Sequence, residues 1–504
     1  MSAYEELERR FRRIVNVRHA ISMLQWDLAT VMPPGGQASR AEQTATLHVL
    51  VHELMTDPRV GELLESAAAS DADLGPWQRA NLREMTRAYV HATAIDAHLV
   101  EALSKGNAAC EALWREARPK SDFAMIRPQL EIVLALQREV AAAKAAKLGL
   151  TPYDALLGEW EPDGKSAEID RVFDPLSKFL RPFLETVLDR QATEGAAHVL
   201  DGPFPIERQR SLCEKLMGVV GFDFRHGRLD VSLHPFCGGT PDDVRITTRY
   251  SENDFTESLM GVLHETGHAL YERGLPADWR YQPVGEPRGM SIHESQSLII
   301  EMQACRSREF LAYLAPLARA AFGASGPSWD AENLYRHYTR VERSLIRVEA
   351  DEVSYPAHVI LRYRLERAML AGDLAVADLP GAWNDGMEEL LGIRPPDDRR
   401  GCLQDIHWYD GAWGYFPTYT LGAMTAAQFF GAAKRDDPSI LDGIRNGNFG
   451  PLVAWLRKHV HGKASLLPAS ELITEATGRP LDPKIFERHL EDRYLGNSSA
   501  VAIG

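Results

Sequence analysis

The sequence predicts a mostly α-helical protein with one small antiparallel sheet. From Tyr4 to about residue 200, apolar residues recur three and four positions apart with charged residues between them, the pattern of amphipathic helices. The same periodicity resumes at Ser251 and continues to about Tyr494. Between Gly227 and Tyr250, short alternating stretches rich in Val, Ile, Thr and Tyr are typical of β-strands instead.

The N-terminal part, residues 1–200, is expected to be a stack of helices. Pro and Gly interrupt it at Met32–Arg40 and at Leu148–Gly164, and again at Asp201–Gln209. None of these breaks is long or polar enough to be a flexible linker, so we interpret them as turns.

The small sheet is expected at residues 227–250. RLDVSLHPF and DVRITTRY have strand character, and CGGTPDD between them has the composition of a turn, which predicts an antiparallel pair. No internal repeat separates this segment from the helices on either side. We therefore predict one domain over residues 1–504.

Composition and charge exclude several classes of protein. With 504 residues, 45% of them hydrophobic and 25% charged, the chain has the balance of a globular protein and not of a disordered, collagen-like or disulfide-stapled one. A net charge of −15 argues against nucleic acid or an anionic membrane as a partner. Five scattered cysteines, and an N-terminus without the apolar core of a signal peptide, favour a cytoplasmic protein.

The sharpest motif is HETGH, in which His264, Glu265 and His268 form an H-E-x-x-H pattern in a helical segment. Residues four apart share one face of a helix, so both imidazoles can reach a single metal ion. Glu265 then stands beside the open coordination position, where a carboxylate can take a proton from water.

A site of this kind needs a third protein ligand, for which an anionic oxygen from a following helix is suitable. Glu294 fits, although Ser291 three residues earlier also makes the pair a possible capping box. His293 is the rival ligand, and only one of two adjacent residues should face the ion. Glu301, on the same helical face as Glu294, could orient a ligand histidine or be an ordinary helix charge.

HETGH and HESQS (His293–Ser297) resemble the metal motifs of the Taq-type carboxypeptidases, zinc-dependent exopeptidases with an HExxH motif. HPF, DVRIT, IRVEAD, GCLQDIHW and the N-terminal QWDLATVMPPGGQASRAEQ are also similar to that family, so the resemblance covers nearly the whole chain. It implies a large helical metallopeptidase with a deep groove, and commonly a homodimer. The sheet would then lie near the metal helix, and residues 251–430 would carry the metal site and the substrate groove.

The residues suggest how the chemistry would work. A zinc-class ion would activate water and polarise the scissile carbonyl, while Glu265 would move the proton to the leaving amine. The same ligands suit Zn²⁺, Co²⁺ and Mn²⁺. Negative charge on the carbonyl oxygen calls for a donor, and Tyr415 is preferred, with His407 close behind and Tyr419 as a further candidate.

An exopeptidase must also bind a free α-carboxylate, for which a guanidinium is the apt group. Arg347 in IRVEAD is one candidate, although Asp351 and Glu349 could hold it in a helix salt bridge. Arg245 in DVRIT is the other, with Asp242 or Asp243 as its alternative partner.

The HPF string is expected to shape the substrate pocket. Phe236 would form a wall of it, whereas His234 has either a binding or a structural role. A peptide could also add alongside the predicted strand, as extended peptides do at exposed sheet edges.

We therefore predict a metal-dependent carboxypeptidase with peptide substrates and broad side-chain preference. The alternative is an oligoendopeptidase or dipeptidyl carboxypeptidase that uses the same HExxH site, in which the arginines are structural. A non-catalytic helical peptide-binding protein is the third reading, against which the intact Glu265 argues.

Overall fold

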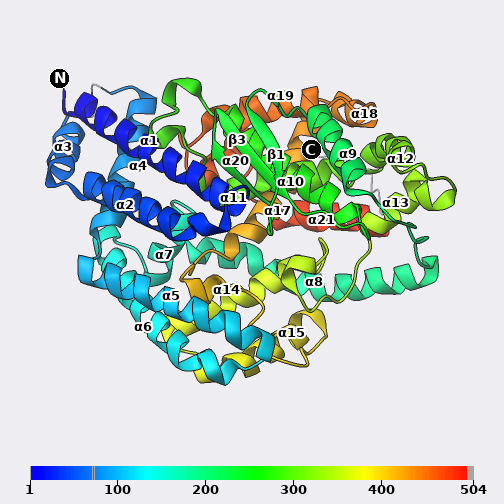
Figure 1. Cartoon of the computed structure of the whole chain (residues 1–504), viewed down its shortest axis with the longest axis horizontal. Coiled ribbons are helices and arrows are strands. Elements are labelled where there is room, and N and C mark those ends of the chain that lie inside the picture. Colours follow the sequence, from blue (N-terminus) through cyan, green and yellow to red (C-terminus); the bar gives the residue numbers. More distant parts are fainter. Residues whose placement is uncertain (1, 71, 73, 497–504) are drawn as a thin grey trace.

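The computed structural model describes residues 2–70, 72 and 74–496, and it is mostly helical, as predicted (Figure 1). The helices that precede the sheet are α1 (Ala3–Ala29), α2 (Gln37–Thr56), α3 (Pro58–Ala68), α4 (Pro76–Thr93), α5 (Ala97–Lys120), α6 (Phe123–Leu148), α7 (Pro152–Trp160), α8 (Ser166–Glu194) and α9 (Ile206–Val220). Those that follow are α10 (Thr256–Gly274), α11 (Gly289–Leu298), α12 (Arg308–Phe322), α13 (Ala331–Tyr338), α14 (Tyr355–Ala371), α15 (Leu379–Leu391), α16 (His407–Asp410), α17 (Pro417–Asp436), α18 (Ser439–Arg445), α19 (Gly450–His459), α20 (Ala469–Thr477) and α21 (Pro483–Leu495). The π-helical segment η5 (Ile299–Cys305) continues α11 directly.

One predicted break is partly wrong. The segment 148–164 contains helix α7, which begins at Pro152. The fixed φ of proline suits the first helical position, and the Thr151 hydroxyl accepts the Asp154 N–H as an N-cap. Pro152, which was expected to end a helix, therefore begins one.

The sheet lies where it was expected but is mixed and not purely antiparallel. Its order is β1 (Gly227–Val231), β3 (Asp243–Thr248), β2 (Phe236–Thr240), with β3 parallel to β1 and antiparallel to β2. The difference arises because CGGT, predicted as part of a turn, forms most of β2. The chain therefore crosses the sheet once more, and β3 returns in the direction of β1.

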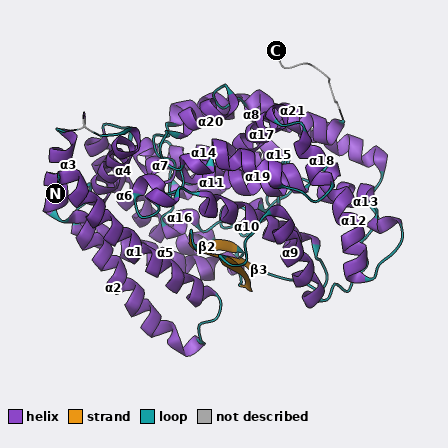
Figure 2. Ribbon diagram, turned by 90° about the horizontal axis from the view of Figure 1, so that it is seen from above, coloured by secondary structure: helices purple, strands orange, loops and turns teal. Residues whose placement is uncertain are grey.

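Helix α10 packs against one face of this sheet and α1 lies on the other (Figure 2). Leu229, Val244 and Ile246 are buried with apolar residues of α10 in one core cluster. On the opposite face, the Arg245 guanidinium lies 4.3 Å from the centre of the Trp26 ring of α1. The sheet thus packs against α10, the helix that contains HETGH, as predicted.

The rest of the core has two further parts. A second cluster of buried apolar side chains joins α6, α8, α14 and α15, and a smaller one joins α1, α3 and α4. The prediction of a single domain over residues 1–504 stays a prediction. Within residues 2–70, 72 and 74–496, the structure contains no helix with the length and hydropathy needed to span a membrane.

Candidate metal centre and active site

His264, His268 and Glu294 converge, as the sequence predicted. Their potential ligand atoms all lie within 4.8 Å of one another. Nε2 of His264 is 3.9 Å from one carboxylate oxygen of Glu294, and Nε2 of His268 is 3.8 Å from the other. Ligands about 2.0 to 2.2 Å from a common ion are themselves about 3 to 4 Å apart, so the set has the dimensions of a metal site.

Two glycines allow α11, which carries Glu294, to lie close to α10 and α17. A Cβ at Gly267, inside the HETGH motif of α10, would lie 2.4 Å from the carbonyl oxygen of Gln296 in α11. A Cβ at Gly422 of α17 would lie 2.8 Å from both Cβ and Cγ of Glu294. Helix α11 is therefore packed closely between α10 and α17. This packing restricts the direction of the Glu294 side chain.

Glu301 supports His264 from the far side of the ring. Its carboxylate lies 2.9 Å from Nδ1 of His264 and also pairs with Arg306. A proton on Nδ1 leaves the lone pair of Nε2 free for a metal ion. Glu301 belongs to the π-helical η5, a type of segment that is frequent at functional sites.

The electrostatics of the cluster favour a cation. Glu265, Glu294 and Glu301 bring three carboxylates into one buried region. Burial opposes a charged imidazole at His264, but these carboxylates outweigh it and raise the pKa of His264 to about 10. The donors, two imidazole nitrogens and a carboxylate oxygen, fit a zinc-class divalent ion.

The capping box of Ser291 and Glu294, the alternative to a ligand role for Glu294, is not formed. Helix α11 has Arg288 at its N-cap, and Ser291 donates its N–H and its hydroxyl to Glu161, which follows α7. His293, the rival ligand, points its Nε2 at Glu272, 2.9 Å away. Its ring stacks on His268 with 4.4 Å between centroids, so it supports that ligand and stands outside the converging set.

Glu265 is buried beside the ligand set, with 8% of its surface exposed. Burial raises the pKa of this carboxyl to about 7, and the neighbouring carboxylate of Glu294 adds to the effect. A carboxyl whose pKa is close to neutral can both accept and return a proton.

The three candidate donors, Tyr415, Tyr419 and His407, form one aromatic cluster. Burial and the Glu294 carboxylate raise the pKa of Tyr415 to about 12, so the phenol stays protonated. Burial also lowers the pKa of His407 to about 4, and its neutral ring lies 3.3 Å from the Tyr419 hydroxyl. Besides burial, the Glu294 carboxylate acts to raise the pKa of both Tyr415 and Tyr419, and His407 contacts Tyr419.

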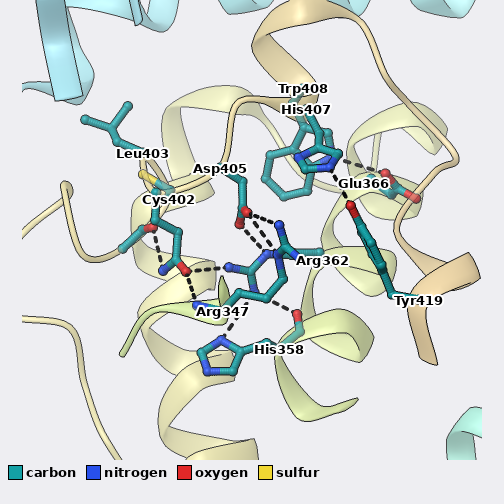
Figure 3. A network of polar contacts seen from close by, with 12 residues as sticks. Arg347, His358, Arg362, Glu366, Cys402, Leu403, Asp405, His407, Trp408 and Tyr419 are labelled. Atoms are coloured by element: carbon teal, nitrogen blue, oxygen red, sulfur yellow. Dashed lines mark hydrogen bonds and ion pairs between the residues drawn. The ribbon is translucent and has the colours of Figure 1, made fainter. Parts of the chain in front are cut away.

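Arg347 lies in a buried network of charges that Figure 3 shows from close by. Asp405 accepts from its Nε at 2.9 Å, and the Tyr355 hydroxyl from its Nη1 at 2.8 Å. The helix salt bridge to Asp351 is therefore not formed. Arg362 shares the same carboxylate, so two buried guanidinium groups face one buried carboxylate.

The remaining predicted residues lie around the sheet. Arg245 forms a bidentate ion pair with Asp243, with N–O distances of 2.6 and 2.7 Å. Asp243 was the alternative partner expected for this residue. Phe236 begins β2 and is half-buried. His234 is exposed, and its carbonyl oxygen accepts the Ser232 hydroxyl at 2.6 Å. Neither Arg245 nor His234 belongs to the converging ligand set.

Sequence reasoning missed two supporting residues. Asp405 stands inside the quoted string GCLQDIHW, but nothing in the string shows that its partners are Arg347 and Arg362. Glu161 lies 130 positions from Ser291, so no local spacing reveals the contact. Such partners become visible only when the fold brings distant segments together.

A helical HExxH metallopeptidase is the class of protein that this fold and this site define. The family model for the carboxypeptidase Taq (M32) metallopeptidases matches residues 6–494. The chain is 38% identical to thermostable carboxypeptidase 1 of Thermus thermophilus, with 98% of each protein covered. It therefore belongs to the carboxypeptidase Taq (M32) family, and its function is that of a metallocarboxypeptidase.

Solved structures agree with this assignment. Metallocarboxypeptidase 1 of Trypanosoma cruzi superposes with a TM-score of 0.96 at 40% identity, covering 98% of this chain and 99% of that one. An M32 carboxypeptidase of Deinococcus radiodurans R1 superposes with a TM-score of 0.92 at 36% identity, covering 98% of each chain. The predicted family, the mostly helical fold and the metal-dependent carboxypeptidase function are thus confirmed.

Proposed function

We propose that this metallocarboxypeptidase is a zinc enzyme that removes the C-terminal residue of peptides with broad side-chain preference. His264, His268 and Glu294 would hold the ion, and Co²⁺ or Mn²⁺ would fit the same donors. Such an ion, when bound, supplies a water of lowered pKa and polarises the scissile carbonyl. The broad preference and the deep groove are expectations from the family resemblance.

Glu265 is proposed as the general base and then the general acid. Its carboxylate stands next to His264 in a buried position, and its pKa of about 7 suits a group that takes a proton from water. The same group can return the proton to the leaving amine. No covalent intermediate with the chain is needed.

Tyr415 is proposed as the donor to the developing oxyanion, with His407 as the second choice. Its protonated phenol lies near Glu294, and its ring is held edge-on against Trp160 with 4.9 Å between centroids. A donor that is already oriented before the reaction costs no reorganisation during it.

The observation that carries the exopeptidase assignment is the charge balance around Arg347. Arg347 and Arg362 are 5% and 0% exposed, and both pair with Asp405. Two buried positive charges therefore face one negative charge, so one positive charge is not neutralised within this network. A guanidinium has five N–H groups, and the contacts to Asp405 and Tyr355 use at most three of those on Arg347. The α-carboxylate of a peptide would complete this network.

The charge of Arg347 also acts on the candidate ligand Glu294. Burial raises the pKa of Glu294, and Arg347 is among the cations that oppose the shift. This favours Arg347 over Arg245, whose guanidinium is already paired with Asp243. Phe236 and His234 are kept as proposed pocket residues on the resemblance alone.

A pair of substrates tests the assignment. We expect a peptide with a free C-terminal carboxylate to be hydrolysed with a kcat/KM about a hundredfold above that of its C-terminally amidated twin, because only the former pairs with Arg347. The Arg347→Lys variant should lose most of this preference. Equal rates for both peptides would favour the endopeptidase alternative.

We further propose a cytoplasmic homodimer without nucleic-acid or membrane partners. All five cysteines are free thiols in the structure, which suits a reducing compartment. The net charge of −15 disfavours binding to polyanions. The dimer is an expectation from the family resemblance, and sedimentation of the purified enzyme measures it.

A further inference from the structure

Helix α11, which carries Glu294, begins without a cap of its own. Its N-cap residue Arg288 makes no side-chain bond to the first turn. The first N–H groups of any helix need acceptors from elsewhere. Here Glu161, just after α7, accepts the N–H of Ser291 at 3.0 Å and its hydroxyl at 2.7 Å.

The junction between α7 and α11 is tightly packed and buried. Glu161 and Ser291 are 5% and 3% exposed. Gly289 at the start of α11 has a φ of +63°, and a Cβ there would lie 3.0 Å from Cδ of Pro162 and 3.2 Å from a Glu161 oxygen. Glycine is therefore needed for the chain to turn into α11 at this distance. A carboxylate at this helix end also suits the helix dipole.

We propose that Glu161 is a positioning residue that sets the place of the metal ligand Glu294. Ser291 lies about one helical turn before Glu294. The hydrogen bonds from Ser291 to Glu161 therefore fix the position of Glu294 along the helix axis. The Nε2–oxygen distances of 3.9 and 3.8 Å to His264 and His268 depend on that position. This inference rests on the proposed zinc site.

The same helix α7 offers a matched control. Asp154 accepts the N–H of Ser166, the first residue of α8, at 2.7 Å and is 7% exposed. It too is a buried carboxylate at the N-terminus of a following helix, but α8 carries none of the proposed ligands. Loss of Asp154 should therefore lower stability without changing the metal site.

The experiment measures zinc affinity. Zinc-loaded full-length protein, its Glu161→Ala variant and its Asp154→Ala variant are titrated with a competing chelator to obtain the Kd for Zn²⁺. We expect Glu161→Ala to raise this Kd about tenfold or more, as loss of an outer support typically does, and Asp154→Ala to change it less than twofold. The visible spectrum of the Co²⁺-substituted protein should change only in Glu161→Ala.

Each other outcome has a defined meaning. An unchanged Kd in Glu161→Ala, or an equal rise in Asp154→Ala, would overturn the positioning role. If Glu161→Ala does not fold, the Ser291→Ala variant replaces it, because this change removes only the hydroxyl that bonds to Glu161. We then expect the Kd for Zn²⁺ to rise about threefold, and an unchanged Kd would overturn the positioning role. A parent protein that takes up no zinc would instead overturn the zinc site itself, and the inference with it.

Discussion

The proposed proton transfers depend on the side-chain carboxylate of Glu265. In the Glu265→Gln variant we expect kcat to fall by about 10² to 10⁴, because the amide keeps the shape but cannot accept a proton. Zinc content should be unchanged, since Glu265 is not a proposed ligand. Steady-state kinetics together with metal analysis check this, and a variant as fast as the parent would refute the general base.

Tyr415 is the residue proposed to stabilise the oxyanion. Tyr415→Phe should lower kcat by about a hundredfold with little change in KM, because the lost hydrogen bond forms only as charge develops. Tyr419→Phe is the matched comparison, since its hydroxyl is directed at His407. A larger loss of kcat in Tyr419→Phe than in Tyr415→Phe would reverse this assignment.

Among the elements, α17 packs closely against α11 at Gly422, directly beside Glu294. Gly422→Ala would place a Cβ 2.8 Å from Glu294, so we expect the Kd for zinc to rise about tenfold and stability to fall by about 1 to 3 kcal/mol. The measurements are chelator competition and chemical denaturation.

Gly431→Ala on the same helix is the control for that substitution. A Cβ at Gly431 meets nothing within 4 Å. Alanine is the better helix former, so stability should stay the same or rise by up to about 1 kcal/mol, and the Kd for zinc should not change. Equal effects of the two substitutions would show that close packing at Gly422 does not position Glu294.

The elements also show how far sequence alone could lead. The helical class and the shared helix face of His264 and His268 were predictable, because i, i+4 spacing is a local property of a helix, whereas the choice of Glu294 depended mainly on the family resemblance. Strand β2 was not predictable, because its Gly-rich CGGT has the composition of a turn and forms a strand only through its pairing with β3. The contact between Ser291 and Glu161 was not predictable for a similar reason, since the two residues are distant in the chain.

At the scale of the whole molecule, stability depends on buried groups that keep one charge state. His461 is 1% exposed, its Nε2 lies 3.0 Å from Oε1 of Gln296 in α11, and burial lowers its pKa to about 3. An unfolded histidine titrates near 6.5. The unfolded chain therefore binds the proton first as the pH falls, and the folded state loses stability below about pH 6.5.

A substitution isolates this contribution. At pH 8, His461→Gln should be less stable than the parent because the packing and the bond to Gln296 are altered. At pH 5 the difference in unfolding free energy should be about 2 kcal/mol smaller, since only the parent resists protonation. Urea unfolding at the two pH values measures it, and a difference that grows toward acid would contradict the neutral buried histidine.

The most direct measurement is the zinc stoichiometry of the purified chain beside that of its His264→Ala, His268→Ala and Glu294→Ala variants. We predict one tightly held ion per parent chain, and a loss of that ion together with peptide hydrolysis in each variant that still folds. A folded variant that keeps its ion at the parent's affinity, or an active parent free of bound metal, would contradict the account.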